Sequence, residues 1–148
     1  MSFLNILFLV LLSFFVAKAE INIEGKHGWA KKLPTWRIKN KFTKIFLGNY
    51  PLTGYHFWIF SGFLLLFHLS FFLGLKWNIS SELKTLSLFL FFALMEDFFW
   101  FIFNPFFGLK KFNKKNISWH GNWFGIIPWS YLKLFFGGLF FLLLSFVF

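Results

Sequence analysis

Residues 83–108, LKTLSLFLFFALMEDFFWFIFNPFFG, decide the fold class. The stretch is long and apolar enough to cross a bilayer, because a membrane-spanning helix needs about 20 predominantly apolar residues. Glu96 and Asp97 nevertheless stand side by side near its middle. An ionisable residue at that depth costs roughly 2.5–3.5 kcal/mol on insertion scales, so the acidic pair needs a partner or a chemical use. The sequence therefore predicts a membrane protein organised around this pair.

The composition agrees with a membrane protein. Of 148 residues, 58% are hydrophobic, 27% aromatic and only 14% charged. A soluble domain of this length has too little interior to bury so much apolar surface, whereas lipid accommodates it. The absence of cysteine excludes disulfides, thiolate metal sites and a cysteine nucleophile. The net charge is +10, and the basic residues gather mostly in two loops, which favours the bilayer and its anionic headgroups over nucleic acid as partners.

Four apolar stretches predict an all-α fold, an integral membrane four-helix bundle forming a single membrane domain over residues 1–148. The spans are expected at 3–18, 52–75, 83–108 and 128–148, with basic loops at 19–51 and 109–127. The first span ends in a small-residue pattern typical of signal-peptidase sites, but no charged side chain precedes it. An uncleaved first helix is therefore favoured, and cleavage of residues 1–19 stays an open alternative.

Charge asymmetry predicts how the bundle is oriented in the cell membrane. With four spans, the two basic loops lie on the same side, and the positive-inside rule makes that side cytoplasmic. Both the N-terminus and the C-terminus are then outside. Cleavage of the first helix would place both basic loops outside, against the rule.

Both basic loops contain patterned segments. In the first loop, Pro34 suits a helix start and Gly48 a helix end, and apolar side chains recur between them at helical spacing, at Ile38, Phe42, Ile45 and Phe46. We expect an additional interfacial amphipathic helix there, with its lysines near anionic headgroups. The second loop leads into the tryptophan-rich segment 117–129, ISWHGNWFGIIPW, which fits either an aromatic anchor that includes Tyr131 or a segment closing a site.

Polar side chains on the third span share one face. Glu96, Trp100 and Asn104 are spaced i, i+4, i+8, and Asp97 is offset from Glu96 by about 100°. Pro105 cannot donate a backbone hydrogen bond, which predicts a kink or an early helix end near Asn104.

A depth count predicts which polar residues could meet. At a rise of about 1.5 Å per residue from the cytoplasmic ends, His56 and Asn104 lie roughly 6 Å deep, Glu96 roughly 18 Å and His68 roughly 24 Å. The count predicts a mouth formed by His56 and Asn104 together with His120, above a deeper site with the acids and His68.

The candidate site residues combine carboxylates with imidazoles. Glu96, Asp97, His120 and His56 are the candidates for acid–base catalysis and for a divalent metal, because carboxylate and imidazole ligands suit zinc, iron or manganese. His68 is an additional candidate. Which cofactor binds, if any, is left open. The candidates for substrate binding are Trp100, Asn104, Trp119, Trp123, Lys110 and Lys111.

Three functions remain open at this level. The favoured one is a cytoplasm-facing enzyme that acts on a lipid or another amphipathic substrate. A small proton-coupled transporter is the second, and four short helices would need a homo-oligomer to enclose a path. The third is a structural or assembly protein in which the acids form a buried polar brace, although interhelical polar contacts in membranes are worth only about 0.6–2 kcal/mol.

Overall fold

The computed structural model describes residues 2–47 and 50–148, without the side chains of residues 44–46, and it is mostly helical. Two short antiparallel pairs join β1 (Arg37–Ile38) to β2 (Leu52–Thr53) and β3 (Trp123–Phe124) to β4 (Ile127–Pro128). A 3₁₀ turn, η1, covers Leu109–Lys111. The α-helices of the described residues are α1 (Phe3–Glu24), α2 (Lys41–Leu47), α3 (Gly54–Phe67), α4 (Leu69–Phe72), α5 (Ile79–Phe103) and α6 (Trp129–Leu144).

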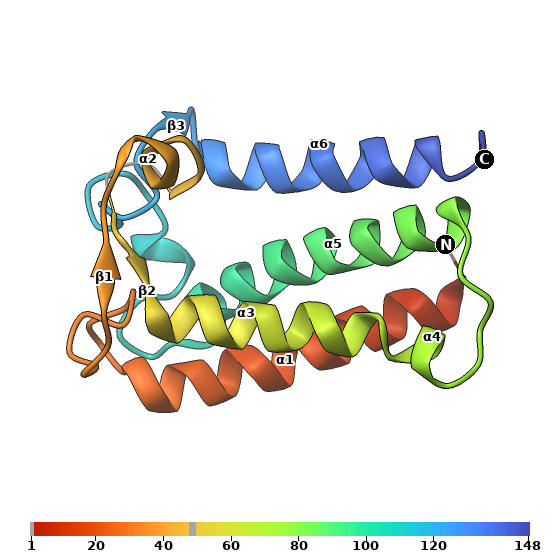
Figure 1. Cartoon of the computed structure of the whole chain (residues 1–148). Coiled ribbons are helices and arrows are strands. Elements are labelled where there is room, and N and C mark those ends of the chain that lie inside the picture. Colours follow the sequence, from red (N-terminus) through yellow and green to blue (C-terminus); the bar gives the residue numbers. More distant parts are fainter. Residues whose placement is uncertain (1, 48–49) are drawn as a thin grey trace.

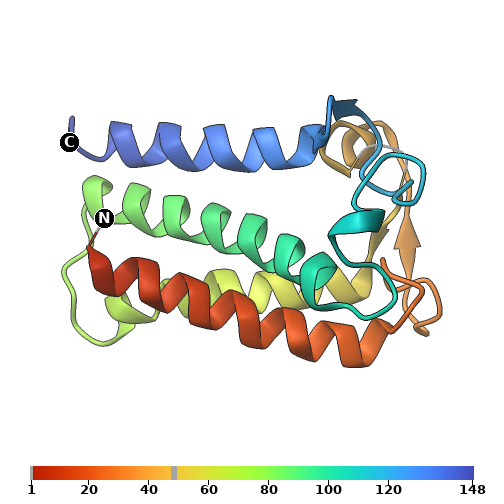
Figure 2. The ribbon, with the colours of Figure 1, turned by 180° about the vertical axis from the view of Figure 1, so that it is seen from behind.

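The helix α5 is the centre of the arrangement. α1 and α6 pack along it, and α3 also contacts it (Figure 1). The four longer helices run side by side, and both chain termini lie at the end opposite the strands and α2 (Figure 2). The segments rich in lysine and tryptophan therefore gather at one end of the bundle, which is called the loop end below.

Two helices are long and apolar enough to cross a membrane. α1 has 22 residues and contains an 18-residue stretch with a mean hydropathy of 2.1, and α5 has 25 residues and contains such a stretch with a mean hydropathy of 1.9. α3 and α6 are apolar but shorter, with 14 and 16 residues. The predicted helical fold with membrane-length apolar helices is confirmed to this extent.

The helix bounds differ from the predicted spans at two informative places. α1 runs past the predicted end at residue 18 to Glu24, where Gly25, with φ 61°, donates its N–H to the Ile21 carbonyl and ends the helix. The second apolar stretch is helical only to Phe67 before the short α4 begins. The extension of α1 brings two further acidic residues into the bundle.

The first basic loop is helical over only part of the range expected from Pro34. The chain first forms β1, and α2 begins at Lys41. Asn40 and Thr43 fix this start, because the Asn40 side chain accepts from the Thr43 N–H at 2.8 Å and the Thr43 hydroxyl oxygen accepts from the Asn40 N–H at 2.9 Å. The prediction of a helix start at Pro34 is therefore wrong, and Gly48 lies outside the described residues.

The end of α5 follows the prediction from Pro105. The helix stops at Phe103, and Asn104 is its C-cap. The Asn104 side-chain amide donates to the Gly25 carbonyl at 3.0 Å, while its oxygen accepts from the Phe106 N–H at 3.0 Å. These bonds tie the end of α5 to the end of α1.

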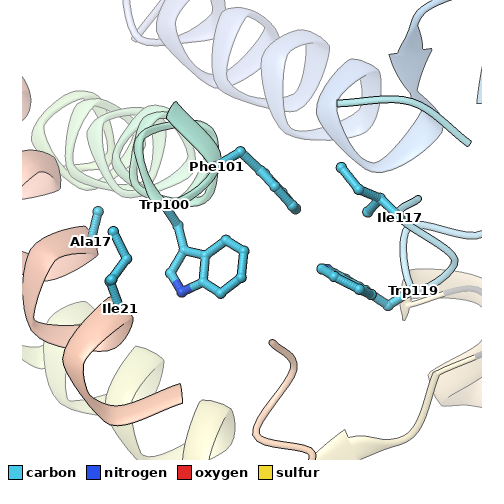
Figure 3. Close-up of a cluster of buried hydrophobic side chains, with 6 residues drawn as sticks. All are labelled: Ala17, Ile21, Trp100, Phe101, Ile117 and Trp119. Atoms are coloured by element: carbon cyan, nitrogen blue, oxygen red, sulfur yellow. The ribbon is translucent and has the colours of Figure 1, made fainter. Parts of the chain in front are cut away.

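A hydrophobic cluster holds the tryptophan-rich segment onto the helix ends (Figure 3). Trp119 stacks on Phe101, with ring centroids 5.9 Å apart and planes 20° apart, and lies edge-on to Trp100. This contact also positions His120, the next residue, against α5. The members of the cluster are Ala17, Ile21, Trp100, Phe101, Ile117 and Trp119.

The contact between α5 and α6 depends on Gly138. The Ser87 hydroxyl donates to the Gly138 carbonyl at 2.8 Å, and a Cβ at this position would lie 3.0 Å from the Phe91 ring. Gly138→Leu is therefore expected to destabilise the protein by about 1–3 kcal/mol through overpacking, measured by denaturant unfolding in detergent. Gly62→Leu is the control, since a Cβ there meets none of the described atoms within 4 Å. Equal stability of the two variants would contradict the packing.

Candidate functional site

A cavity of about 500 Å³ lies among α1, α3, α5 and α6 near the loop end. Much of its wall is apolar and comes from α3 and α5, which contribute Phe57, Phe60, Leu64, Phe89, Leu90 and Ala93. An apolar cavity with a few converging polar groups is typical of a ligand-binding site. The polar lining residues are Glu20, Glu24, His56, Ser61, Glu96, Asp97, His120, Ser130, Tyr131 and Lys133.

An acid–histidine pair joins α5 to the segment before α6. The His120 Nε2 atom lies 3.2 Å from the Asp97 Oδ2 atom, within ion-pair range but without hydrogen-bond alignment. The Tyr131 hydroxyl donates to the same carboxylate oxygen at 2.6 Å, and the Ser130 hydroxyl lies 3.2 Å from His120 Nδ1. The His120 side chain is only 6% exposed. This imidazole is thus held at the cavity wall, with its Nε2 atom next to Asp97 and without a hydrogen-bond partner among the described residues.

A second acid–histidine group joins α1 to α3. The His56 Nε2 atom lies 3.5 Å from Glu24 Oε1, and His56 Nδ1 shares a hydrogen bond of 2.7 Å with the Thr53 hydroxyl. Glu24 Oε1 also accepts from the Ala30 N–H. Glu20 lies one turn before Glu24 on α1, and one ligand atom from each of Glu20, Glu24 and His56 falls within 4.8 Å of the others.

The loop after α1 is shaped around this group. Trp29 and Ala30 adopt left-handed backbone conformations with φ of 51° and 49°, which are uncommon outside glycine. The Trp29 ring stacks on His56 with centroids 4.5 Å apart, and its indole N–H donates to the Pro51 carbonyl at 2.8 Å. The conformation directs the Ala30 N–H to Glu24. Backbone strain of this kind is often found at functional sites.

Two carboxyl groups are buried between α1 and α5. Glu96 is 2% exposed and Glu20 is 5% exposed, and each interacts electrostatically with the other. The Oε1 atom of each, together with the Tyr55 hydroxyl and the Trp100 indole N–H, finds no hydrogen-bond partner among the described residues. Unpaired buried polar groups cost free energy, so such a group at a cavity wall points to a bound ligand, ion or water.

The structure brings all four predicted catalytic residues to one cavity. Glu96, Asp97, His120 and His56 all line it, as do Trp100 and Trp119. The predicted metal-ligand set is divided, however, because His120 pairs with Asp97 on one side and His56 pairs with a glutamate of α1 on another.

His68 is not brought to this cavity. Its Nε2 atom lies 2.9 Å from Glu82 Oε1, close to the start of α5. The depth count began at residue 108, whereas α5 ends at Phe103. Counted from Phe103, Glu96 is roughly 10 Å deep, while His68 lies roughly 21 Å from the start of α3, so the two residues differ in depth.

Four predicted substrate-binding residues are likewise not among the described residues that line the cavity. Asn104 uses its side chain to join helix ends, as given above. Trp123 packs on Phe112, with ring centroids 5.4 Å apart. Lys110 and Lys111 lie in η1 and are exposed, and the Lys111 ammonium donates to a backbone carbonyl at 2.6 Å.

The sequence analysis missed Glu20, Glu24 and Tyr131 as site residues. Glu20 and Glu24 are spaced i, i+4, which places both carboxyl groups on one helix face, but only if the first helix continues past Lys18. Tyr131 fits an interfacial anchor in the sequence, and nothing local shows that its hydroxyl reaches Asp97.

Comparisons with protein-family models, with curated proteins and with solved structures find no match. Function is therefore inferred from the geometry of the cavity and from the side chains that line it.

Proposed function

We propose that the protein is a multi-pass membrane enzyme that acts on a lipid or another amphipathic substrate from the cytoplasmic side. The observation that carries this proposal is the cavity, which combines an apolar wall with buried carboxyl and imidazole groups. His120 and Asp97 are the proposed acid–base pair.

The outward faces of the helices support a position within the bilayer. Large apolar side chains are exposed on α1, α3 and α6, among them Phe15, Leu65, Phe136 and Phe140. Exposing such surface to water costs about 25 cal/mol per Å², whereas lipid accepts it. α1, α3, α5 and α6 would be the four spans, with α4 extending the short α3. Exposed lysines in both basic loops favour a cytoplasmic loop end by the positive-inside rule, with both termini outside.

The cavity wall suggests the class of substrate. Phenylalanine and leucine side chains of α3 and α5 offer an apolar surface to an acyl chain, and the acids and histidines offer polar contacts to a headgroup. Lys133 also lines the cavity. With the lysines of the two basic loops it favours an anionic headgroup, because anionic lipids attract clustered basic residues.

The geometry supports proton transfer by His120. Its Nε2 atom would take a proton from the substrate or give one to it, while the Asp97 carboxylate stabilises the charged imidazole at 3.2 Å. The Tyr131 hydroxyl holds Asp97, and Ser130 at Nδ1 fixes the orientation of the imidazole ring. Side chains positioned in this way contribute to rate through pre-organisation.

Conversion of lipid by the purified protein is the test. The protein is reconstituted into liposomes made from total polar lipids that include anionic phospholipids, with and without added Zn²⁺ and Mn²⁺, and the lipids are followed by mass spectrometry. The wild type is expected to convert at least one lipid species, and Asp97→Asn is expected to slow this conversion by about tenfold or more, because the imidazole loses its charged partner.

His27→Ala is the matched control. His27 lies in a loop and is not among the described lining residues. Its replacement is expected to leave conversion unchanged. No lipid conversion by the wild type, or equal conversion by Asp97→Asn, would overturn the proposal.

A further inference from the structure

We propose that Glu20, Glu24 and His56 bind one divalent transition-metal ion of the zinc, manganese or iron class. The inference rests on the geometry of these three residues and does not require the proposed lipid chemistry. It assigns a ligand set different from the one that the sequence predicts, since only His56 belongs to both.

The spacing of the ligand atoms fits a shared ion. Glu20 and Glu24 project from one face of α1, and His56 comes from the first turn of α3. The distance of 3.5 Å between His56 Nε2 and Glu24 Oε1 is long for a hydrogen bond. It matches the separation of about 3.4 Å expected for two ligands placed tetrahedrally at about 2.1 Å from one zinc ion. Small side-chain movements would bring Glu20 to the same distance, because the three ligand atoms already lie within 4.8 Å of one another.

The surrounding contacts orient the ligands as they do in known metal sites. The Thr53 hydroxyl engages His56 Nδ1 at 2.7 Å, which leaves Nε2 directed to the carboxylates. The Trp29 ring stacks on the imidazole plane, and the Ala30 N–H holds Glu24. Hydrogen bonds to the second nitrogen of a ligating histidine and to ligating carboxylates fix ring orientation and metal affinity.

An unpaired buried oxygen is the independent sign of a ligand. Glu20 is 5% exposed, and its Oε1 atom has no hydrogen-bond partner among the described residues. Glu96 adds a second buried carboxyl that interacts with Glu20 and Glu24. The charge of several buried carboxyl groups close together must be neutralised by protons or by a cation. A divalent ion that is also bound by one histidine would provide this neutralisation. Three protein ligands leave a fourth position that would face the cavity, as in catalytic zinc sites.

Metal binding by the purified full-length protein tests the inference without any turnover assay. Protein in detergent is stripped with a chelator and titrated separately with Zn²⁺, Mn²⁺ and Fe²⁺, the last under anaerobic conditions. Elemental analysis gives the bound equivalents, and calorimetry gives the affinity. The wild type is expected to bind one equivalent of at least one of these metals, more weakly at lower pH because the ligands must be deprotonated. His56→Ala and Glu20→Gln are expected to weaken binding by at least about 10–100-fold.

Two controls keep the result interpretable. His68→Ala and Glu82→Gln alter a different histidine–carboxylate pair, which lies near the opposite end of the bundle, and are expected to leave binding unchanged. Glu20→Asp keeps a carboxylate and is expected to retain weakened binding, which separates ligand loss from misfolding. Absence of metal binding by the wild type, or binding that survives both His56→Ala and Glu20→Gln, would overturn the proposed site. Because metal binding is measured without turnover, loss of the proposed site would not reject the proposed enzyme, and a lack of lipid conversion would not reject the site.

Discussion

Replacing Glu96 by methionine is expected to stabilise the protein while slowing lipid conversion, because Glu96 is a polar group of the cavity wall. Glu96 is 2% exposed and its Oε1 atom has no hydrogen-bond partner among the described residues, so the wild type bears the cost of this buried carboxyl. Methionine has a similar length and no polar atom that needs a partner. An unsatisfied buried polar group costs about 1–3 kcal/mol, so the gain in stability is expected in this range. Unfolding in detergent measures the first effect and the liposome assay the second.

The same variant separates a functional acid from a structural one. If Glu96 acts as a polar brace, Glu96→Met lowers the folded yield and the midpoint of unfolding, since its partners lose a hydrogen bond. If Glu96 serves the cavity, stability rises and activity falls, the trade-off expected where function needs a destabilised site. A variant that is both less stable and inactive would support the brace and count against the proposed function.

Glu82→Met provides the comparison on the same helix. Glu82 accepts from the Trp77 indole N–H at 3.0 Å and pairs with His68 at 2.9 Å. The Trp77 side chain is exposed and His68 is partly exposed. Its replacement removes satisfied contacts and is expected to lower stability by up to about 1 kcal/mol without changing lipid conversion. If Glu96→Met raises stability and Glu82→Met lowers it, the free-energy cost of the Glu96 carboxyl comes from its buried position at the cavity.

The sequence alone was sufficient to identify α5, the helix against which α1, α3 and α6 pack. Apolar length, the adjacent acids Glu96 and Asp97, and Pro105 are local features. They predicted α5, a kink or early end near Asn104, and two of the acids that line the cavity. His120 was also among the candidates, and the tryptophan-rich segment around it was expected either to anchor at the interface or to close a site. Trp119 indeed packs on Phe101 and Trp100.

The other site residues, Glu20, Glu24 and Tyr131, could not be predicted from local sequence patterns. Lys18 interrupts the apolar run in the sequence, but its side chain is exposed on α1 and the helix continues past it. The helix ends before Gly25, and this extension brings Glu20 and Glu24 into the bundle. In the first basic loop, Arg37 and Ile38 lie within the predicted helix but form β1 instead. Their partner strand β2 follows the predicted helix in the sequence, so no local pattern indicates the pairing. Depth along a span was misjudged wherever a helix end was misplaced by a few residues.

The largest loss of activity is expected for His120→Ala. His120 is the proposed proton carrier, and general acid–base catalysis contributes about 10²–10⁴-fold to rate, so kcat for lipid conversion should fall by a factor in this range. The His120 side chain lies among aromatic rings of Phe101, Phe112 and Tyr131, and alanine would leave a gap there. His120→Gln, which retains much of the volume, is therefore measured beside it. Both variants should lose activity to a similar degree if the imidazole itself is required.

Tyr131→Phe tests whether the pair is held in position from α6. The substitution removes the hydroxyl that donates to Asp97 at 2.6 Å and keeps the ring that packs on Phe112. A hydrogen bond to a charged group is worth about 1.5–3 kcal/mol, so kcat is expected to fall by about 10–100-fold with little change in KM.

Tyr50→Phe serves as the matched control for the loss of a tyrosine hydroxyl. The Tyr50 hydroxyl shares a hydrogen bond of 2.8 Å with the Ser118 hydroxyl, and Tyr50 is not among the described residues that line the cavity. Its removal should leave kcat unchanged. If Tyr131→Phe raised KM alone, the tyrosine would contact the substrate rather than position Asp97. If neither Tyr131→Phe nor His120→Gln altered kcat, the acid–base pair would have no part in the reaction, and the catalytic proton would have to be carried by another lining group such as Glu96.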